Sequence, residues 1–357
     1  MLLSHNCYFR VITNHSTQRL LVRPKEDHMI ERRTLLKTLA GTGAVAAAFA
    51  VLPPHLALAQ TRRIKRLRIV APAAAGSGYD ETARVCERLM TEAGLIDSAQ
   101  ITNIPGAGGT VGLVKFLEQY RGHDDALLVA GSTMVSAIIA NKTSVEISAA
   151  TPIARLYGTA NALIVPASSP YKTIDGLMSA FRNAPETISW AGGSTGGGDH
   201  LIAGMFAKTA GVDPKRLNYV AFAGGGEILA ALLGGHVTMA SSTWGEVAEQ
   251  VRSGEVRCLG VTAGKDETGI TAPTLRSQGV DLVFYTWRAL LGAPGINVQQ
   301  RENLLATVDA MIKSDAWKAE IVRQGWIDFY LPGDAFASFV QEQSQIFRTT
   351  LESLGLA

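Results

Sequence analysis

The chain contains, at Ile188–Gly211, the stretch ISWAGGSTGGGDHLIAGMFAKTAG. A short strand-like run leads into five glycines, and a segment with a helical spacing of apolar residues follows. Such a junction leaves the first backbone N–H groups of the helix unpaired and places the positive end of its dipole at the loop. The stretch therefore predicts a strand, a glycine loop and a helix N-terminus that can bind an anion.

The same unit recurs along the chain. Strand-like runs at Leu67–Val70 and Gln100–Ile104 are each followed by a glycine-containing loop and a helical pattern, and Ala126–Ala130 leads into Gly131-Ser132-Thr133. Strands that alternate with helices in this way predict an α/β fold with mostly parallel sheets. Ligands of such sheets bind at the carboxyl ends of the strands, where these loops lie.

The length of 357 residues allows two domains. We expect the chain to cross into a second domain near Pro166–Leu177 and to cross back in the apolar run Phe284–Leu291. The predicted division is 60–165 plus 286–357 for domain 1 and 166–285 for domain 2. Helical patterns after residue 298 are expected to pack on domain 1.

Composition and charge limit the possible partners. Hydrophobic residues make up 47% and charged residues 18% of the chain, which predicts a globular fold. The net charge is +2, but residues 1–59 hold seven Lys/Arg and three Asp/Glu, so the remainder carries −2. A mildly acidic domain argues against nucleic acid as a partner, and a bound anion must be held by local donors.

The N-terminus has the organisation of an export signal. Charged residues at Glu31–Lys37 precede an Ala-rich apolar run, Thr38–Leu52, and Ala57-Leu58-Ala59 is a small-x-small cleavage site. We expect cleavage after Ala59; Arg32-Arg33 favours the twin-arginine route and leaves the Sec route open. Met29 is an alternative start. The apolar run is too short for a membrane anchor, and of the three cysteines only Cys86 and Cys258 lie in the mature part, where free thiols are expected.

Several of these motifs match a known family in its order. The chain from about Leu67 onward resembles the substrate-binding proteins of tripartite tricarboxylate transporters, the Bug-type or TctC-type extracytoplasmic solute receptors. The matching pieces are Gly76–Asp80 with Thr82–Arg84, Pro105–Gly109, Pro166–Leu177, Gly192–Leu201, Gly224–Gly226, Leu233–Val237 and Ser253–Ala263.

The resemblance implies a two-domain periplasmic-binding-protein fold of the type II-like, Venus flytrap kind, which closes over a small carboxylate. It also implies a periplasmic location, membrane permease subunits as partners, a monomeric state, and no cofactor or catalysis. Tyr79–Arg84 and Asn103–Leu113 look closest to citrate-type receptors, which favours a di- or tricarboxylate. Residues Ala73, Ala223, Thr238 and Ser242 depart from the common pattern and leave the identity of the ligand open.

By that resemblance the ligand is held by backbone N–H groups, waters and Ser/Thr hydroxyls at the glycine loops. The predicted ligand-binding residues are Ala75, Gly76, Ser77, Gly78, Tyr79, Asp80, Gly108, Ser132, Thr133, Ser194, Thr195, Gly196, Gly197, Gly198, Asp199, His200, Gly224, Gly225, Ser242 and Trp287. Arg288 is a further candidate as a bidentate partner of a carboxylate, with a structural ion pair as the alternative.

Other chemistries have weaker support. Gly192–Gly196 satisfies GxSxG, which would make Ser194 the nucleophile of a serine hydrolase, but only His200 and His236 follow it, so the triad is hard to complete. The mature part has no GxGxxG, no HExxH and no cysteine cluster, so neither a nucleotide nor a metal is expected. A receptor that reports a carboxylate to a signalling partner remains an alternative.

Overall fold

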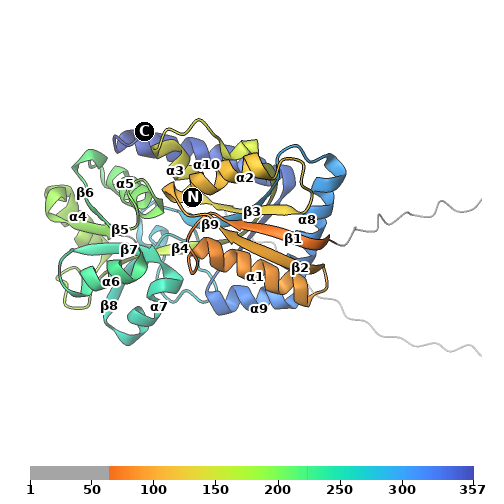
Figure 1. Ribbon diagram of the computed structural model, residues 1–357. Helices are drawn as coiled ribbons and strands as arrows, with labels where there is room; N and C mark the ends of the chain where they lie inside the picture. Colours follow the sequence, from red (N-terminus) through yellow and green to blue (C-terminus); the bar gives the residue numbers. More distant parts are fainter. Residues whose placement is uncertain (1–63, 223) are drawn as a thin grey trace, which may run out of the picture. The chain divides into compact units, whose positions relative to one another are not determined.

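The first strand group consists of three parallel strands. In the computed structural model, which describes residues 64–222 and 224–357, β1 pairs in parallel with β2 on one side and β3 on the other. Each of these strands is followed by a helix (Figure 1). The elements are β1 (Ile64–Ala71), α1 (Gly78–Glu92), β2 (Ile96–Asn103), α2 (Thr110–Gln119), β3 (Ala126–Gly131) and α3 (Ser132–Ala140). The predicted export signal, the cleavage after Ala59 and the start at Met29 lie outside the described residues.

The second strand group repeats this arrangement. Strand β5 pairs in parallel with β6 and β7, and β8 runs antiparallel to β4. The opening stretch of the sequence forms a strand, a loop and a helix as predicted. The elements are α4 (Ile174–Asn183), β5 (Ser189–Gly192), α5 (Gly198–Ala210), β6 (Asn218–Ala221), α6 (Gly225–Leu233), β7 (Met239–Thr243), α7 (Trp244–Ser253) and β8 (Val256–Val261).

Two strands connect the groups. Strand β4 (Thr151–Pro166) is 16 residues long; residues 151–160 pair with β9 (Tyr285–Gly292), and residues 161–166 pair with β7 and β8. Strand β9 also pairs with β3, and both of its pairings are antiparallel. The predicted α/β class is confirmed with one refinement: pairing is parallel within β1–β3 and β5–β7, whereas the connecting strands make the sheet mixed because they run against their neighbours.

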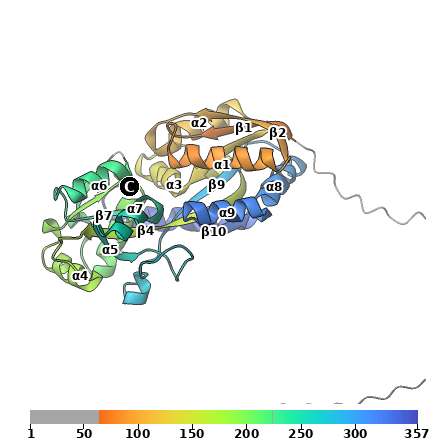
Figure 2. The same ribbon diagram turned by 90° about the horizontal axis from the view of Figure 1, so that it is seen from below.

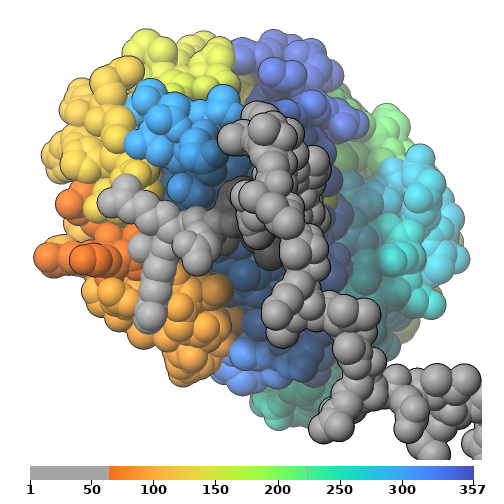
Figure 3. All heavy atoms as spheres, turned by 90° about the vertical axis from the view of Figure 1, so that its right-hand side faces the viewer, coloured from red at the N-terminus to blue at the C-terminus, as the bar shows by residue number. Residues whose placement is uncertain are grey.

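The C-terminal part packs on both strand groups. It comprises α8 (Val298–Lys313), α9 (Asp315–Gln324), β10 (Ile327–Pro332) and α10 (Gly333–Ser353), and β10 pairs with β4. Helix α8 lies against α1 (Figure 2), and α10 packs against both α3 and α5 (Figure 1). In the space-filling view the dark blue C-terminal part of the chain meets both yellow and green surface (Figure 3). In α10, Thr349 accepts a hydrogen bond from Lys208 of α5, at 3.2 Å. We expected the C-terminal helices to pack on domain 1 alone, but α10 contacts both strand groups. The domain boundaries themselves stay a prediction.

The interior consists of two clusters of buried apolar side chains. One buried cluster includes Trp190, Trp287 and Phe116, and a smaller one forms around Trp244 and Ile164. Cys86 and Cys258 are free thiols. Short 3-10 helices lie at Ala107–Gly109, Ile147–Ala149, Pro185–Thr187, Pro214–Arg216 and Arg276–Gln278. Within the described ranges no helix combines the length and the apolar character that a membrane span requires.

Candidate functional site

The first glycine loop is fastened by Asp80. Its carboxylate accepts hydrogen bonds from the Gly76 N–H at 2.8 Å, from Asn103 at 2.9 Å and from Arg84 at 2.8 Å. Burial would raise the pKa of Asp80, but these hydrogen bonds outweigh it and hold the pKa below its usual value. Ser77 caps α1 by accepting from the Asp80 N–H. Asp80 and Ser77 therefore hold the loop in place, and Ala75 and Gly76 form its exposed tip.

Arg288 lies between the beginnings of two helices. A Cβ atom on Gly78 would lie 3.0 Å from Arg288 Nη2, and one on Gly131 would lie 3.1 Å from Nη1. Gly78 begins α1, and Gly131 directly precedes α3. The two glycines leave the space that the guanidinium occupies, and its carbon lies 4.7 Å from the centre of the Tyr79 ring. Tyr79 is thus a support for Arg288, and burial raises the pKa of its hydroxyl.

The charge of Arg288 has no anionic partner within residues 64–222 and 224–357. Arg288 is half-buried, its Nη1 donates to the Trp287 carbonyl at 3.3 Å, and its buried Nε has no hydrogen-bond partner there. Helix N-termini carry a partial positive charge, so the starts of α1 and α3 add to that of the guanidinium. An anion supplied from outside would complement all three.

The second loop supports α3 from behind. Gly108 has φ +66°, and a Cβ there would lie 2.5 Å from the Cβ of Ala137, so only glycine fits without a shift. In the first turn of α3, Ser132 is 1% exposed and its hydroxyl has no hydrogen-bond partner among the described residues. Thr133, beside it, is half-buried. Ser132 and Thr133 directly follow Gly131, which approaches Arg288, whereas Gly108 acts through packing.

The third loop encloses His200. Its Nδ1 accepts a hydrogen bond from the Gly196 N–H at 3.1 Å, and its ring stacks on Tyr219 with centres 3.9 Å apart. Burial lowers the pKa of His200 to about 4, so the ring is neutral at pH 7 with its proton on Nε2. Ser194 and Thr195 are exposed on this loop. No hydrogen bond joins Ser194 to a histidine in the described part of the chain, so the GxSxG motif lacks the base that a hydrolase requires.

A polar network ties the third loop to the connecting strands. Asp199 accepts from the Gly193 N–H at 2.9 Å and from the Asn161 amide at 3.0 Å. Asn161, on β4, accepts in turn from Thr286 of β9 at 3.0 Å. Burial raises the pKa of Asp199 to about 6. A Cβ on Gly198, which begins α5 next to Gly197, would lie 3.6 Å from the Thr286 hydroxyl, so Thr286 links β9 to this loop.

The fourth loop already faces a carboxylate of the protein. Glu246 accepts a short hydrogen bond from the Ser242 hydroxyl, and its Oε2 would lie 3.2 Å from a Cβ on Gly225, in the first turn of α6. Gly224 precedes Gly225 as the N-cap of α6. Gly224, Gly225 and Ser242 were predicted to hold the ligand, and the structure places Glu246 against the last two.

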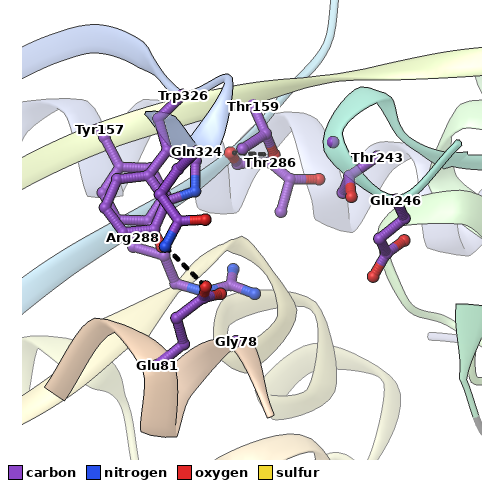
Figure 4. Close-up of a pocket in the computed structure, with 11 residues that line it drawn as sticks. Gly78, Glu81, Tyr157, Thr159, Thr243, Glu246, Thr286, Arg288, Gln324 and Trp326 are labelled. Carbon is purple, nitrogen blue, oxygen red and sulfur yellow. Dashed lines mark hydrogen bonds between the residues drawn. The ribbon is translucent and has the colours of Figure 1, made fainter. Parts of the chain in front are cut away.

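A pocket of about 290 Å³ brings these elements together (Figure 4). It is lined by Gly78, Glu81, Tyr157, Thr159, Thr243, Gly245, Glu246, Thr286, Arg288, Gln324 and Trp326. Arg288 and Glu81 lie on one side, and Thr243 and Glu246 lie on the other. Glu81 accepts from Gln324 at 2.8 Å, and the rings of Tyr157 and Trp326 stack with centres 3.7 Å apart.

The structure brings some of the predicted ligand-binding residues to the pocket and leaves others away from it. Gly78 lines the pocket itself, and the loops of Ser132, Gly198 and Gly225 are adjacent to it through Arg288, Thr286 and Glu246. Trp287 lies in the core instead, fully buried against Phe336 and Phe339. Successive side chains of a strand point to opposite faces, so Thr286 and Arg288 face the pocket and Trp287 faces the core. The prediction of Trp287 as a ligand contact therefore does not fit the structure.

Some pocket residues had a signal in the sequence, and others had none. Thr243 ends β7, Gly245 and Glu246 follow it, and Glu81 follows the first glycine loop. Their positions could therefore have been inferred from the rule that located the other loops. Gln324 ends α9 and Trp326 lies between α9 and β10, and neither has such a signal. Among residues 64–222 and 224–357, no group of three or more His, Cys, Asp or Glu is placed to hold a metal ion.

Comparison with known proteins gives consistent matches. The family model described as "Tripartite tricarboxylate transporter family receptor" matches residues 83–356. Protein BugT of Bordetella pertussis (strain Tohama I) is 21% identical over 326 residues, which are 90% of this chain and 98% of BugT.

Two solved structures share the fold. MatC from Rhodopseudomonas palustris, with bound malate, has a TM-score of 0.67 and 20% identity over 81% of this chain and 99% of MatC. An R. palustris protein with adipate has a TM-score of 0.69 and 20% identity over 82% of this chain and 97% of that protein. The family inferred from the sequence motifs and the two-domain fold class are thus confirmed.

Proposed function

Since the chain belongs to the family of tripartite tricarboxylate transporter receptors, we propose that it captures a small carboxylate outside the cytoplasm and delivers it to the membrane subunits of such a transporter. As a member of a receptor family the chain is a solute-binding protein and not an enzyme. In this role the protein is periplasmic, is exported by the signal that ends at Ala59, and works as a monomer.

One observation carries the proposal that the ligand has a carboxylate. Arg288 is a half-buried cation at the beginnings of α1 and α3, without an anionic partner in the described part of the chain. Desolvating a charge is costly unless an opposite charge compensates it. A carboxylate of the ligand would accept two parallel N–H bonds from the guanidinium and would also complement both helix dipoles.

The neighbouring hydroxyls can complete this half of the site. Ser132 offers a buried hydroxyl without a partner among the described residues, and Thr286 lines the pocket on the same face of β9 as Arg288. The malate and adipate bound by the two similar structures are small carboxylates of the kind that a pocket of about 290 Å³ admits. The citrate-type ligand that the sequence motifs favour belongs to the same class.

A ligand screen tests the proposal. The unfolding temperature of the purified protein is measured with citrate, malate, adipate, succinate, glutamate and aromatic acids, and each positive response is repeated by calorimetry. A ligand at 100 times its Kd should stabilise the protein by about 2.7 kcal/mol, which is readily seen as a shift in Tm. If none of a broad set of carboxylates changes Tm or releases heat, the proposed function is wrong.

The location is tested separately by cell fractionation. We expect the mature protein, without residues 1–59, in the periplasmic fraction. Recovery of the uncleaved chain in the cytoplasm would contradict the proposed location without affecting the ligand chemistry.

A further inference from the structure

The pocket contains an acidic side chain where the sequence predicted a ligand carboxylate. Glu246, in the first turn of α7, lies against Gly225 at the start of α6 and accepts the hydroxyl proton of Ser242. The first turn of a helix is favourable for a negative charge, and Glu246 supplies it from within the chain. The starts of α6 and α7 are therefore already complemented by a negative charge of the protein, which weakens their attraction for an external anion.

The buried hydroxyl beside Glu246 is also used. Ser242 is 2% exposed, and its only hydroxyl proton goes to Glu246. A second carboxylate of the ligand placed on this side would meet the negative charge of Glu246 without gaining the Ser242 hydrogen bond. The group that complements Glu246 is a donor, and a positively charged donor complements it best.

The opposite side of the pocket carries one charge of each sign. Arg288 is cationic and has no anionic partner in the described ranges, whereas Glu81 is acidic and accepts one hydrogen bond from Gln324. Among the lining side chains there are thus one cation, Arg288, and two acids, Glu81 and Glu246. A trianion such as citrate would add three negative charges to a lining that already has two acids and one cation. A molecule with one carboxylate and one ammonium group would instead pair with Arg288 on one side and with Glu246 on the other.

We propose that Glu246 makes this receptor selective for a small amino carboxylate, whose carboxylate binds Arg288 and whose ammonium group faces Glu246. This inference rests on the proposed function and specifies the substrate class of the same site. It replaces the di- or tricarboxylate that the motifs favoured, because the motifs lie in the loops around Arg288 and contain no information on Glu246. The pocket of about 290 Å³ is at the lower end for small-molecule sites, which keeps the ligand small.

Calorimetry with matched ligands tests the inference. Each pair has the same chain length and differs in one end group: succinate with 4-aminobutyrate, glutarate with 5-aminopentanoate, and adipate with 6-aminohexanoate, together with the common α-amino acids. For the wild-type protein the tightest ligand should contain an ammonium group. The Glu246→Gln variant keeps an acceptor for Ser242 but removes the charge, and should shift the affinity ratio toward the dicarboxylate by at least about threefold.

Glu249→Gln is the matched control. Glu249 is one turn further along α7, is exposed, and pairs with Arg252 away from the pocket. The control should leave every affinity ratio unchanged.

The outcomes separate the two proposals. If dicarboxylates bind the wild-type protein more tightly than their amino partners, or if Glu246→Gln leaves the ratio unchanged, the inference is wrong while the proposed function stands. If no carboxylate or amino acid of the whole set binds, the proposed function is wrong and the inference is wrong with it. The wild-type ratio decides the matter even if the variant is poorly folded.

Discussion

Replacing Arg288 by glutamine should weaken ligand binding while leaving the free protein folded. In the free protein Arg288 makes no ion pair with the described residues; beyond its approach to Gly78 and Gly131, it makes one hydrogen bond at 3.3 Å and faces the Tyr79 ring at 4.7 Å. A cation–π contact of this kind contributes about 0.5–1 kcal/mol. Removing a cation from two helix N-termini offsets part of that loss. We therefore expect the free energy of unfolding to change by no more than about 1 kcal/mol.

Binding should change much more than stability. The variant loses a charge-assisted hydrogen bond to the ligand carboxylate, for which about 1.5–3 kcal/mol is typical. At about 1.4 kcal/mol per factor of ten, Kd should rise roughly ten- to hundredfold. The assay is calorimetric titration of the best ligand of the screen, with denaturant unfolding of the free protein alongside.

The control is Arg252→Gln, since Arg252 is exposed and pairs with Glu249 at 2.7 Å. It should leave Kd unchanged. A Kd of Arg288→Gln within twofold of the wild type would refute the assignment of the carboxylate to Arg288. A loss of more than about 3 kcal/mol of stability would show instead that Arg288 is a structural residue.

Three further changes test the surroundings of the site. Asn161→Ala removes two hydrogen bonds and leaves the Thr286 hydroxyl without its acceptor and Asp199 with one donor fewer, so denaturant unfolding should show a loss of about 2–4 kcal/mol; a loss below about 1 kcal/mol would contradict the network. Folding lowers the pKa of His200 from 6.5 to about 4, so the neutral ring's contribution is present above pH 6.5 and disappears as the pH falls through 4. The stability difference between the wild type and His200→Gln should therefore shrink by about 2–3 kcal/mol from pH 7 to pH 4, and a constant difference would refute this. Gly108→Ala, with φ +66° and its Cβ only 2.5 Å from that of Ala137, should lose roughly 2 kcal/mol or more, whereas Gly224→Ala, with nothing within 4 Å, should be nearly neutral; equal effects would contradict the packing at Gly108.

Local patterns predicted most of the elements of this fold. The opening stretch forms β5, the glycine loop and α5, as its pattern predicted, and the Thr173 hydroxyl caps α4. These features depend on residues close in sequence: glycines between apolar runs, and a hydroxyl before a helical pattern. Strand β10 was missed because its pairing with β4 joins residues more than 150 positions apart, and no local signal reports such a contact.

The site was harder to predict than the fold. The Gly131–Arg288 register between β3 and β9 places the guanidinium beside the first glycine loop, and this register is a non-local fact. Adjacent residues of a strand point to opposite faces, so of the two neighbouring candidates Arg288 lines the pocket and Trp287 is buried in the core. Glu246 lies four residues beyond Ser242, so its carboxylate reaches back to a hydroxyl that was expected to bind the ligand.

A ligand-bound crystal structure tests the central claim most directly. With the tightest carboxylate of the screen, we predict a ligand carboxylate oxygen within about 3 Å of Nη1 or Nη2 of Arg288, the distance of a charge-assisted hydrogen bond. A ligand whose carboxylates all lie away from Arg288, with the guanidinium still unpaired, would contradict the claim.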